Sequence, residues 1–527
     1  MLALTHALGA ERSGPELMER ILLEAKAITR AEGGTLYLRD AEDRLQFEIL
    51  RNDRLGIARG GTTGAPVGLP PVPLFGAGGV ENHAHVAAHA VHRAEVVEVE
   101  DAYATDRFDF SGTRSFDAET GYRSRSFLTV PLQSREGRVI GALQLINARD
   151  EEGAVVPFDP RRREVAVALA AQAAVLLEAR LLYEEQRKLL DAFLHVIAES
   201  IDRKSPYTGG HCRRVPALTE MLVHAMHEVE DGPFAEVRLD EDAWYELHVA
   251  SWLHDCGKIT TPPHVMDKAM KLEGVRDGLD AVAARFCAAA AQGADRDELA
   301  AELEFLRRVN RGGESMSRED QERVRRLAER SYLDLDGVKQ PLLTDEEVEN
   351  LQVARGTLTE AERLVINGHM VETVLMLDAL PFPAHLRNVP HIACGHHERM
   401  NGEGYPRGLY AGDMLPQARA MAIADVFEAL TAADRPYKPP MKLSQALGIM
   451  SRMKEGHHLD PDLFDLFVTS GVYRRYAERF LEPEQIDHVD EAALLAARPP
   501  PLELPPREER DRRWTGFLPK YQPLARR

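Results

Sequence analysis

Two adjacent pairs of residues in this sequence have the types and spacing of metal ligands. His254 and Asp255 follow one another in WLHDCGK, and His396 and His397 follow one another in GHHERMNGEGYP. Three further candidates are His211 in SPYTGGHCRRV, His369 in AERLVINGHMVETVLML and Asp425 in MAIADVFEALTAADRPY. Imidazole and carboxylate groups bind iron, manganese, zinc and nickel in varying mixtures. Because a carboxylate has two oxygens, Asp255 can span two metal ions while His254 binds one of them.

Each candidate has an ordinary structural explanation beside the chemical one. Taken singly, each residue can be a hydrogen-bonded polar group of the core or the surface. A buried Asp425 within AIADVF is costly, however, unless it is paired or metal-bound. His396 and His397 cannot point one way in a helix, where neighbours differ by about 100°, but they can reach one metal pair from two sides. The metal hypothesis therefore depends on the whole set, which occurs in one order within predicted helices.

The composition limits the classes of protein that fit. The chain has 527 residues, and its 65 Lys and Arg against 85 Asp and Glu give a net charge of −20. This charge argues against a protein that coats nucleic acid or lies on an anionic membrane, because both need a basic face. It leaves one small anionic substrate open. At about 150 residues per domain, the length predicts two to four domains.

The sequence contains no pattern typical of a targeting segment. The N-terminal MLALTHALGAERSG lacks the basic and long apolar regions of a signal peptide. The most apolar stretch, Ala166–Leu177, is shorter than the roughly 20 residues of a membrane span. Four cysteines without a CxxC pair indicate neither a disulfide scaffold nor a zinc site. We expect a cytoplasmic protein with reduced thiols and no membrane span, which leaves association with a membrane-bound partner open.

The elements that must position these residues differ along the chain. Residues 1–160 alternate helix and strand patterns, with a helix at Leu17–Ile28 and a Gly- and Pro-rich loop at Gly60–Gly79. The expected strands are Thr35–Leu38, Gln46–Leu50, Val96–Val99, Ser126–Leu132 and Val139–Ile146. Because a short turn joins the last two, the pattern favours an antiparallel sheet.

From Asp159 onward the pattern changes to one long helix. Eleven positions follow a heptad spacing, nine of them apolar or aromatic: Ala166, Leu169, Ala173, Leu176, Arg180, Tyr183, Arg187, Leu190, Leu194, Ile197 and Ile201. Two interpretations stand: a helix packed on its own domain, or a parallel dimer helix linking two domains over residues 181–203. The chain after Lys204 is expected to be almost wholly helical, and its Pro-rich end, residues 484–527, to be an extended tail from about Arg498 rather than a packed domain.

The ordered set H…HD.GK…H…HHE..NG.GYP…D resembles the HD-GYP family of metal-dependent phosphohydrolases over residues 188–483. The resemblance implies an all-helical HD domain that hydrolyses cyclic di-GMP, with a two- or three-metal centre often holding iron or manganese. The implied ligands are His211, His254, Asp255, His369, His396, His397 and Asp425. Asp202 stands where some relatives have a Glu that supports a third metal; because Asp reaches less far, a binuclear centre is the expectation.

The resemblance also implies roles beyond metal binding. Lys258 matches the family's catalytic lysine, which stabilises developing charge or protonates the leaving oxygen, although a lysine there can also satisfy helix-end carbonyls. Arg435 and Lys438, in DRPYK, resemble phosphate-binding cations or form a solvated basic loop. The motif loop contains Gly402, Gly404, Tyr405 and Pro406, which are turn residues that shape the site. In the family this loop is associated with contacts to diguanylate cyclases.

Two features depart from the family pattern. The gap of 115 residues between His254 and His369 is unusually long, so that residues 268–357 are interpreted as an insertion that caps the site or builds a dimer face. Asn401 stands where the family commonly has Asp, which is a mild change at a turn.

The N-terminal region, residues 15–180, resembles a GAF domain in TGYRSRSFLTVPLQSREGRVIGALQLINA and in DAYATDRFDFSG. The pattern typical of cyclic-nucleotide-binding members is absent, because Ala148 follows Asn147 and Arg162 and Arg163 follow Phe158. No cysteine is present for bilin attachment. A small-molecule pocket and a purely dimerising role both remain open.

Together these patterns predict a multidomain chain: an α+β GAF domain, a long linker helix and an all-α HD-type domain. The leading hypothesis is a metal-dependent phosphodiesterase that hydrolyses cyclic di-GMP to linear pGpG and/or GMP under control of the GAF domain. The alternatives are a hydrolase of another cyclic dinucleotide, such as cyclic GMP-AMP, and a non-catalytic cyclic di-GMP receptor. We expect a homodimer that binds a cyclic dinucleotide and, as a partner, a diguanylate cyclase or another signalling protein.

Overall fold

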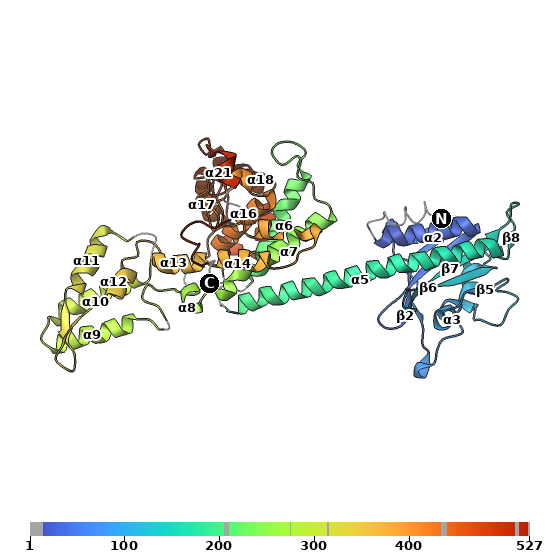
Figure 1. Cartoon of the computed structure of the whole chain (residues 1–527), viewed down its shortest axis with the longest axis horizontal. Coiled ribbons are helices and arrows are strands. Elements are labelled where there is room, and N and C mark those ends of the chain that lie inside the picture. The colour runs from blue at the N-terminus through green and yellow to red at the C-terminus, as the bar shows by residue number, and fades with distance from the viewer. Residues whose placement is uncertain are drawn as a thin grey trace. The chain divides into compact units, whose positions relative to one another are not determined.

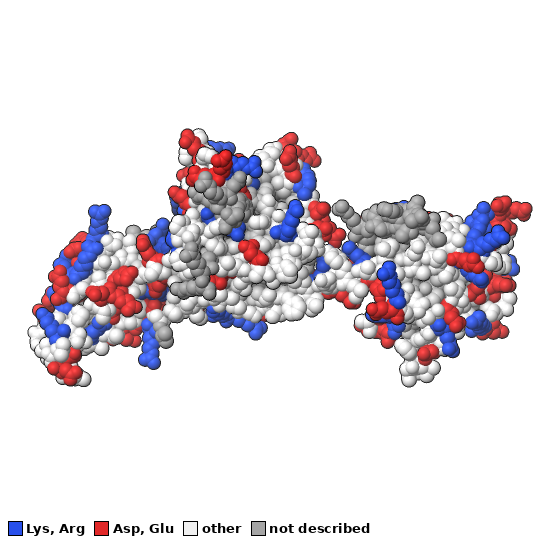
Figure 2. Space-filling model, in the orientation of Figure 1, with Lys and Arg blue, Asp and Glu red and all other residues white. Residues whose placement is uncertain are grey.

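The computed structural model describes residues 14–204, 210–274, 276–312, 316–433, 440–511 and 516–524 (Figure 1). The chain divides into two compact units, residues 1–189 and residues 190–527. Lys, Arg, Asp and Glu side chains are interspersed over the described parts of the face that Figure 2 shows, without a broad basic patch there.

The first unit is built on an antiparallel sheet with the strand order β3-β2-β1-β7-β6-β5. Its strands are β1 (Ala31–Arg39), β2 (Arg44–Asn52), β3 (Ile57–Gly60), β4 (Val72–Pro73), β5 (Val97–Val99), β6 (Phe127–Gln133), β7 (Val139–Arg149) and β8 (Val155–Val156). Strand β4 pairs with β2, and β8 pairs with β7. The antiparallel pairing of β6 and β7 across their short turn is as the sequence predicts.

Helices cover both faces of this sheet, which is why β7 is buried almost throughout. On one face, α2 (Gly14–Thr29) and the start of α5 (Pro160–Lys204) form a core with Leu36, Leu143 and Leu145. On the other face lie α3 (Val86–Arg93) and α4 (Ser111–Thr120), with smaller clusters around Ala142 and Phe127. The layers are therefore helix, sheet and helix.

Helix α5 runs without a break for 45 residues, and neighbouring cores cover several of its predicted heptad positions. Leu169 and Ala173 belong to the core of the first unit, and Leu194 and Ile201 belong to the core of the second. The large apolar side chains exposed on the helix after Leu169 are Leu182, Leu189, Phe193 and Val196, at 57–60% exposure, and Ile197, at 39%. Some predicted heptad positions thus pack within the chain itself, whereas Ile197 faces outward together with four residues outside those positions.

Helix α5 is also long and apolar enough, by length and composition alone, to cross a membrane. A third of its most apolar window is buried inside the protein. Leu169, Ala170 and Ala173 of this part of the helix pack against the sheet. Packing in the core of the first unit therefore accounts for part of its apolar composition.

The second unit is helical around one large core. Its main helices are α6 (His211–Glu228), α7 (Glu241–Leu253), α8 (Pro263–Met266), α13 (Glu360–Asn367), α14 (His369–Asp378), α15 (Val389–Ala393), α16 (Pro416–Thr431), α17 (Leu443–Glu455), α18 (Pro461–Thr469) and α19 (Val472–Phe480). The short 3₁₀ helix η3 (Cys256–Thr260) follows α7. Helix α16 packs on α6 and α14 packs on η3, which brings distant parts of the sequence together.

The stretch 268–357 forms a subdomain with its own core, made by Phe286, Leu306 and Val324 among others. It contains α9 (Leu279–Ala291), α10 (Arg296–Asn310), α11 (Arg318–Ala328), α12 (Asp345–Leu351) and a hairpin of β9 (Ser331–Leu333) and β10 (Lys339–Pro341). In Figure 1 this subdomain extends away from α6, α14 and α16. The hairpin is an addition to the helices that the sequence predicts.

The C-terminal end is not the extended tail that its composition predicts. It contains α20 (Glu491–Ala496) and α21 (Arg507–Asp511), and Leu502 packs beside Met400 and Leu409. Tyr521 is fully buried. Proline prevents regular hydrogen bonding but not packing, so composition alone does not reveal these contacts.

Candidate metal centre

The candidate ligands stand at the ends of helices that converge in the second unit. His211 and His369 are the first residues of α6 and α14, and His254 directly follows α7. His396 and His397 lie in the turn after α15, whereas Asp425 lies inside α16. Helix ends leave room for side chains of several helices to meet at one point.

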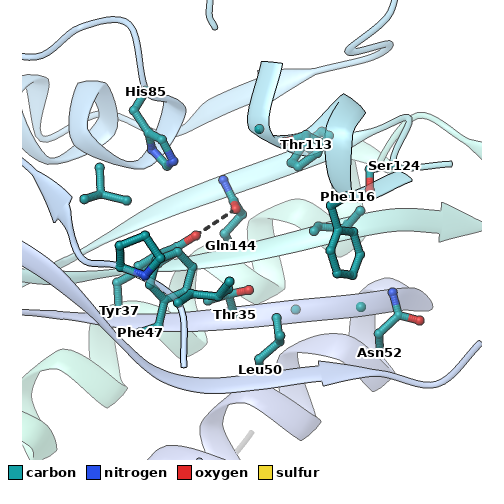
Figure 3. Close-up of a pocket in the computed structure, with 18 of the residues that line it drawn as sticks. Thr35, Tyr37, Phe47, Leu50, Asn52, His85, Thr113, Phe116, Ser124 and Gln144 are labelled. Carbon is teal, nitrogen blue, oxygen red and sulfur yellow. Dashed lines mark hydrogen bonds between the residues drawn. The ribbon is translucent and has the colours of Figure 1, made fainter. Parts of the chain in front are cut away.

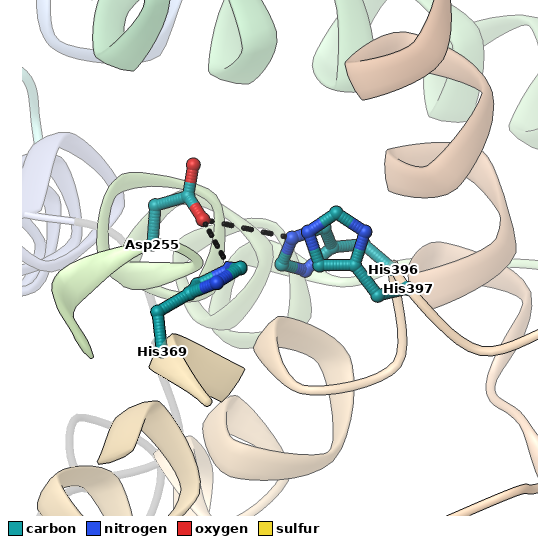
Figure 4. A group of neighbouring side chains, drawn as sticks. All are labelled: Asp255, His369, His396 and His397. Atoms are coloured by element: carbon teal, nitrogen blue, oxygen red, sulfur yellow. Dashed lines mark ion pairs between the residues drawn. The ribbon is translucent and has the colours of Figure 1, made fainter. Parts of the chain in front are cut away.

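The structure brings six of the seven predicted ligands into two groups that can hold metal ions. One group contains Asp255, His369, His396 and His397 (Figure 4), and the other contains His211, His254 and Asp255. Within each group the ligand atoms all lie within 4.8 Å of one another. Asp255 belongs to both groups, which is the bridging arrangement that the adjacent His-Asp pair predicts.

Three of the histidines are oriented by the same local contact. The Nδ1 atoms of His254, His369 and His396 lie 2.6–2.7 Å from the backbone carbonyl oxygens three residues earlier. A carbonyl only accepts hydrogen bonds, so each Nδ1 donates and carries the proton. In the neutral ring, Nε2 then has a free lone pair, which is the orientation that metal-binding histidines show.

These free lone pairs point at a carboxylate, and this fits a bound cation. The Nε2 atom of His254 lies 3.1 Å from Asp255 Oδ2, and that of His369 lies 3.2 Å from Asp255 Oδ1. Among the described residues, these Nε2 atoms, the His396 Nε2 atom and Asp255 Oδ1 are buried without a hydrogen-bond partner. Burial, together with the neighbouring His254, lowers the pKa of His396 to about 4 and keeps that ring neutral. Facing acceptors in a buried site repel one another unless a cation lies between them, so the residues fit divalent metals.

His211 is held by a carboxylate that the sequence analysis missed. Its Nδ1 atom lies 2.6 Å from Glu428 Oε2, and Arg214 Nε donates to Glu428 Oε1 at 2.8 Å. Burial opposes the charged forms, but this contact raises the pKa of His211 to about 9 and, with Arg214, lowers that of Glu428 to about 2. Glu428 thus orients the Nε2 atom of His211 toward Asp255, which lies 3.1 Å away. The sequence could have indicated Glu428, because it stands three residues after Asp425 and this spacing puts both carboxylates on one face of α16.

The remaining predicted residues differ in how close they lie to these two groups. Asp425 Oδ1 is 3.5 Å from His211 Nε2 and so reaches the second group. Asp202 accepts a hydrogen bond from the Gly210 backbone at 3.1 Å and belongs to neither group. Arg435 and Lys438 lie outside the described residues.

Lys258 lies directly at the bridging carboxylate. Its Nζ atom is 2.5 Å from Asp255 Oδ2, and its side chain is 20% exposed. Burial works against the ammonium form, but Asp255 and Asp425 outweigh it and raise the pKa of Lys258. The lysine therefore carries its positive charge at the mouth of the site.

The loop with Gly402, Gly404, Tyr405 and Pro406 is held from within by Glu398. This buried carboxylate accepts backbone hydrogen bonds from Arg407, Gly408 and Leu409 at 2.8–3.1 Å. A Cβ atom at Gly404 would lie 2.4 Å from the Glu398 Cα atom, so the close approach requires glycine. The ring of Tyr405 stacks on His397, with centroids 4.9 Å apart and an interplanar angle of 15°.

A pocket of 230 Å³ opens on the two groups. Its lining includes His211, Lys258, His369, His397, Tyr405 and Asp425. No residue of 268–357 is among those described around it, so in the described part of the chain the insertion does not cap this pocket. The volume is below the roughly 300–1,000 Å³ of whole small-molecule sites.

A second cavity, of 520 Å³, lies in the first unit between the sheet and α4 (Figure 3). Tyr37 Oη donates to Gln144 Oε1 at 3.2 Å, and His85 Nδ1 accepts from the Ala87 backbone. Among the residues described around the cavity, Arg51 is the only Lys or Arg, and it is engaged by Glu19 and backbone carbonyls. Burial lowers the pKa of His85 to about 4. The cavity is therefore mainly apolar, and its polar groups include the neutral His85 ring and the carboxylate of Asp109.

Comparison with known proteins identifies both units. Residues 14–177 match the family model for the GAF domain, and residues 345–463 match the family model for the HD domain. Over 113 residues the chain is 40% identical to a 3'3'-cGAMP-specific phosphodiesterase 1 of Vibrio cholerae serotype O1, covering 21% of this chain and 25% of that protein. Over 142 residues it is 35% identical to a probable cyclic di-GMP phosphodiesterase of the same organism, covering 26% and 32%.

Among solved structures, the GAF domain of an Acinetobacter phosphoenolpyruvate-protein phosphotransferase aligns with 35% of this chain and 94% of that chain, at 17% identity and a TM-score of 0.26. The matched segments span about a quarter to a third of the two phosphodiesterase relatives. The chain thus contains a region that matches the GAF domain and, after helix α5, a region that matches the HD domain. This is the pair of domains that the sequence predicts.

Proposed function

We propose that this protein is a metal-dependent phosphodiesterase that hydrolyses cyclic di-GMP to linear pGpG and/or GMP. The observation that carries the proposal is Asp255, which is shared by two groups of histidines, three of which have a buried Nε2 atom without a hydrogen-bond partner among the described residues. Such a pair of sites suits the in-line displacement at phosphorus, where the attacking and leaving oxygens both need stabilisation. The names of the relatives, cyclic dinucleotide phosphodiesterases, support the substrate class.

The metal centre we propose contains two divalent ions, iron or manganese. His369, His396 and His397 would hold one ion, His211, His254 and Asp425 the other, and Asp255 both. A third ion at Asp202 has no support, because that carboxylate is outside both groups. When bound, a pair of divalent ions lowers the pKa of water and withdraws charge from phosphate oxygens.

The chain's own residues provide the rest of the mechanism. The carbonyls of Ser251, Ile366 and Ala393 accept hydrogen bonds from the Nδ1 atoms of three histidines and so leave their Nε2 atoms facing Asp255. Lys258, charged and partly exposed beside Asp255, is placed to offset the negative charge on phosphorus oxygens or to give its proton to the leaving oxygen. The ring of Tyr405 forms an apolar wall of the pocket and limits access of bulk water.

Cyclic GMP-AMP is the second candidate substrate. The observation that favours it is the 40% identity to a 3'3'-cGAMP-specific phosphodiesterase over 113 residues. The two substrates differ in one base. A non-catalytic receptor is disfavoured, because every predicted ligand is present and Lys258 lies beside them.

The test is hydrolysis by full-length protein purified without oxygen and loaded with iron or manganese. Cyclic di-GMP and cyclic GMP-AMP are supplied separately, and the products are separated by chromatography. We expect turnover of cyclic di-GMP, its loss in His254→Ala/Asp255→Ala, and its retention in His264→Ala, an exposed histidine of the same stretch. Hydrolysis of neither substrate by metal-loaded protein would refute the enzymatic function.

We further propose that the GAF domain regulates hydrolysis through a small, mainly apolar ligand that carries no anionic group. The cavity of 520 Å³ supports this, because its lining is mainly apolar and Arg51 is already engaged. Asn147, which belongs to the motif of cyclic-nucleotide-binding relatives, is instead used structurally: its side chain bonds Glu32, Tyr122 and the Arg125 backbone. A phosphate ligand would find no free cation among the residues described there.

The active form we propose is a cytoplasmic homodimer that joins through α5. The exposed stripe of Leu182, Leu189, Phe193 and Val196 supports the dimer, because three of these residues repeat at intervals of seven. The four cysteines are free thiols, which fits a reducing compartment.

A further inference from the structure

Residues near the C-terminus contact the loop beside the candidate metal centre. We call residues 516–524 the C-terminal strap. Its Leu518 backbone N–H donates to the carbonyl of Pro406 at 2.9 Å, so the strap is hydrogen-bonded to the motif loop. Tyr521, in the middle of the strap, is fully buried, although the surrounding sequence is polar and Pro-rich.

Tyr521 stands behind the ring that stacks on His397. Its ring centroid lies 5.9 Å from that of Tyr405, and the Tyr405 ring in turn lies 4.9 Å from His397. The Tyr521 ring is tilted by 35° against Tyr405, whereas Tyr405 is stacked on His397, so ring contacts lead from the strap to a candidate ligand. Removal of the Tyr521 ring would thus take away an aromatic contact of Tyr405.

His397 depends on this stack more than the other histidines do. The rings of His254, His369 and His396 are each held by a hydrogen bond from Nδ1 to a carbonyl. Among the hydrogen bonds of the described residues, none involves the His397 ring. Its contacts are aromatic, with His369, His396 and Tyr405. The orientation of His397 is thus set by packing, and Tyr521 supplies the outer layer of that packing.

The strap also contacts the segment that carries His369. Tyr521 Oη accepts a hydrogen bond from Asn367 Nδ2 at 3.1 Å. Leu524 lies against Gly368, where an added Cβ atom would be 2.9 Å from Leu524 Cδ1. Because His369 directly follows Gly368 and begins α14, the strap touches the backbone immediately before a second candidate ligand.

We propose that the C-terminal strap positions the metal site formed by Asp255, His369, His396 and His397, with Tyr521 as the positioning residue. The proposal rests on the metal-binding role proposed above for these residues. Tyr521 does not touch the reacting atoms; it acts through Tyr405 on His397. Loss of its ring leaves a cavity behind Tyr405, lets that ring shift and releases His397 from its orientation. Outer contacts that orient ligands commonly change metal affinity about 10–100-fold.

The experiment measures metal retention by the full-length protein, independently of substrate. Manganese-loaded wild type, Tyr521→Ala, Tyr521→Phe and Leu504→Ala are mixed with excess chelator, and metal release is followed over time. Leu504→Ala is the matched control, because it removes an exposed apolar side chain from the same C-terminal region. Thermal unfolding of each variant is recorded in parallel.

We expect one of two ions to leave Tyr521→Ala about ten-fold faster than wild type. Tyr521→Phe keeps the ring against Tyr405 and should release metal at the wild-type rate, as should Leu504→Ala. If Tyr521→Ala does not fold, Tyr521→Leu, which fills part of the space without a stacking ring, takes its place in the comparison.

Three outcomes would overturn the proposal. Wild-type release from Tyr521→Ala, even with a lower melting temperature, would show a merely structural contact. Release from Tyr521→Phe as fast as from Tyr521→Ala would exclude stacking as the route. Equal loss from Leu504→Ala would indicate general loosening of the C-terminal region. A protein that hydrolyses no cyclic dinucleotide but loses metal in this pattern would refute the proposed function and leave the strap proposal standing.

Discussion

At the scale of single residues, the site combines groups that the sequence reveals with groups that it hides. The histidines and aspartates stand out because their types are rare in apolar helices. The residues that orient them do not: Glu428 and Glu398 look like ordinary helix and loop carboxylates until the fold buries them. Their roles follow from their contacts: Glu428 hydrogen-bonds His211, and Glu398 accepts from three backbone N–H groups of the loop.

Glu428→Gln tests whether the carboxylate behind His211 supports metal binding. The amide keeps an oxygen acceptor near Nδ1 but loses the charge, so His211 becomes a weaker ligand. We expect affinity for the ion nearest His211 to fall about 10–100-fold, measured by manganese titration of the full-length protein. Glu403→Gln, in the exposed part of the motif loop, is the control and should bind like wild type. Unchanged affinity in Glu428→Gln would contradict the orienting role.

Gly404→Ala tests the close approach inside the motif loop. The added Cβ atom would lie 2.4 Å from the backbone of Glu398 and Arg399, and backbone cannot give way as a flexible side chain can. We expect a loss of about 1–3 kcal/mol in the free energy of unfolding of the HD domain, followed by Trp fluorescence. Gly448→Ala, inside α17 with nothing within 4 Å, should instead stabilise by about 0.5–1 kcal/mol. A neutral Gly404→Ala would show that the loop is free to relax.

At the scale of elements, periodicity predicts what local sequence determines and misses what tertiary packing decides. The strands Ser126–Leu132 and Val139–Ile146 are nearly as predicted because alternation and a short turn specify them. Periodicity alone does not show which heptad positions of α5 are covered, because two stripes of the helix are apolar and the neighbouring cores decide which residues they bury. The strap could not be predicted, because the contact between Tyr521 and Tyr405 joins residues 116 positions apart. The order of the ligands was predictable because the chemistry fixes their types.

The N-terminus of α3 gives the GAF domain a pH-dependent stability. His85 caps this helix by accepting from the Ala87 backbone, and burial lowers its pKa from 6.5 to about 4. Between pH 4 and 6.5 the unfolded state therefore binds more protons than the folded state, so stability falls as the pH falls through this window. One pKa unit corresponds to about 1.4 kcal/mol. After a discount for partial exposure of His85, we expect the free energy of unfolding to fall by about 2 kcal/mol across this window.

His85→Asn separates capping from titration. Asparagine caps helices well and does not titrate, so the variant should match wild type at pH 7 and retain more stability at pH 4.5. Hydrogen exchange of peptides covering 86–133 in the full-length proteins provides the measurement, since comparison at the same pH cancels the intrinsic rate. Equal exchange of both proteins at pH 4.5 would contradict the neutral buried histidine.

At the scale of the whole molecule, α5 is the one continuous element that belongs to both units. Its ends are anchored in separate hydrophobic cores, through Leu169 and Ala173 at one end and Leu194 and Ile201 at the other. Between these anchors the helix exposes large apolar side chains, which a monomer in water would leave uncovered. A second copy of the same helix would cover them in register, because the repeat is self-complementary in a parallel pair.

Leu189→Glu and Phe193→Glu test this dimer. Both residues are more than half exposed, so the changes leave the two cores intact while placing like charges in the seam. We expect each variant to shift the full-length protein from dimer to monomer in analytical ultracentrifugation at micromolar concentration. Lys188→Glu, an exposed neighbour outside the stripe, makes a larger change of charge and should remain dimeric. If wild type sediments as a monomer, or if Lys188→Glu dissociates as fully as the other two variants, the stripe is not the dimer interface. The signal from the GAF domain must then pass along a single helix.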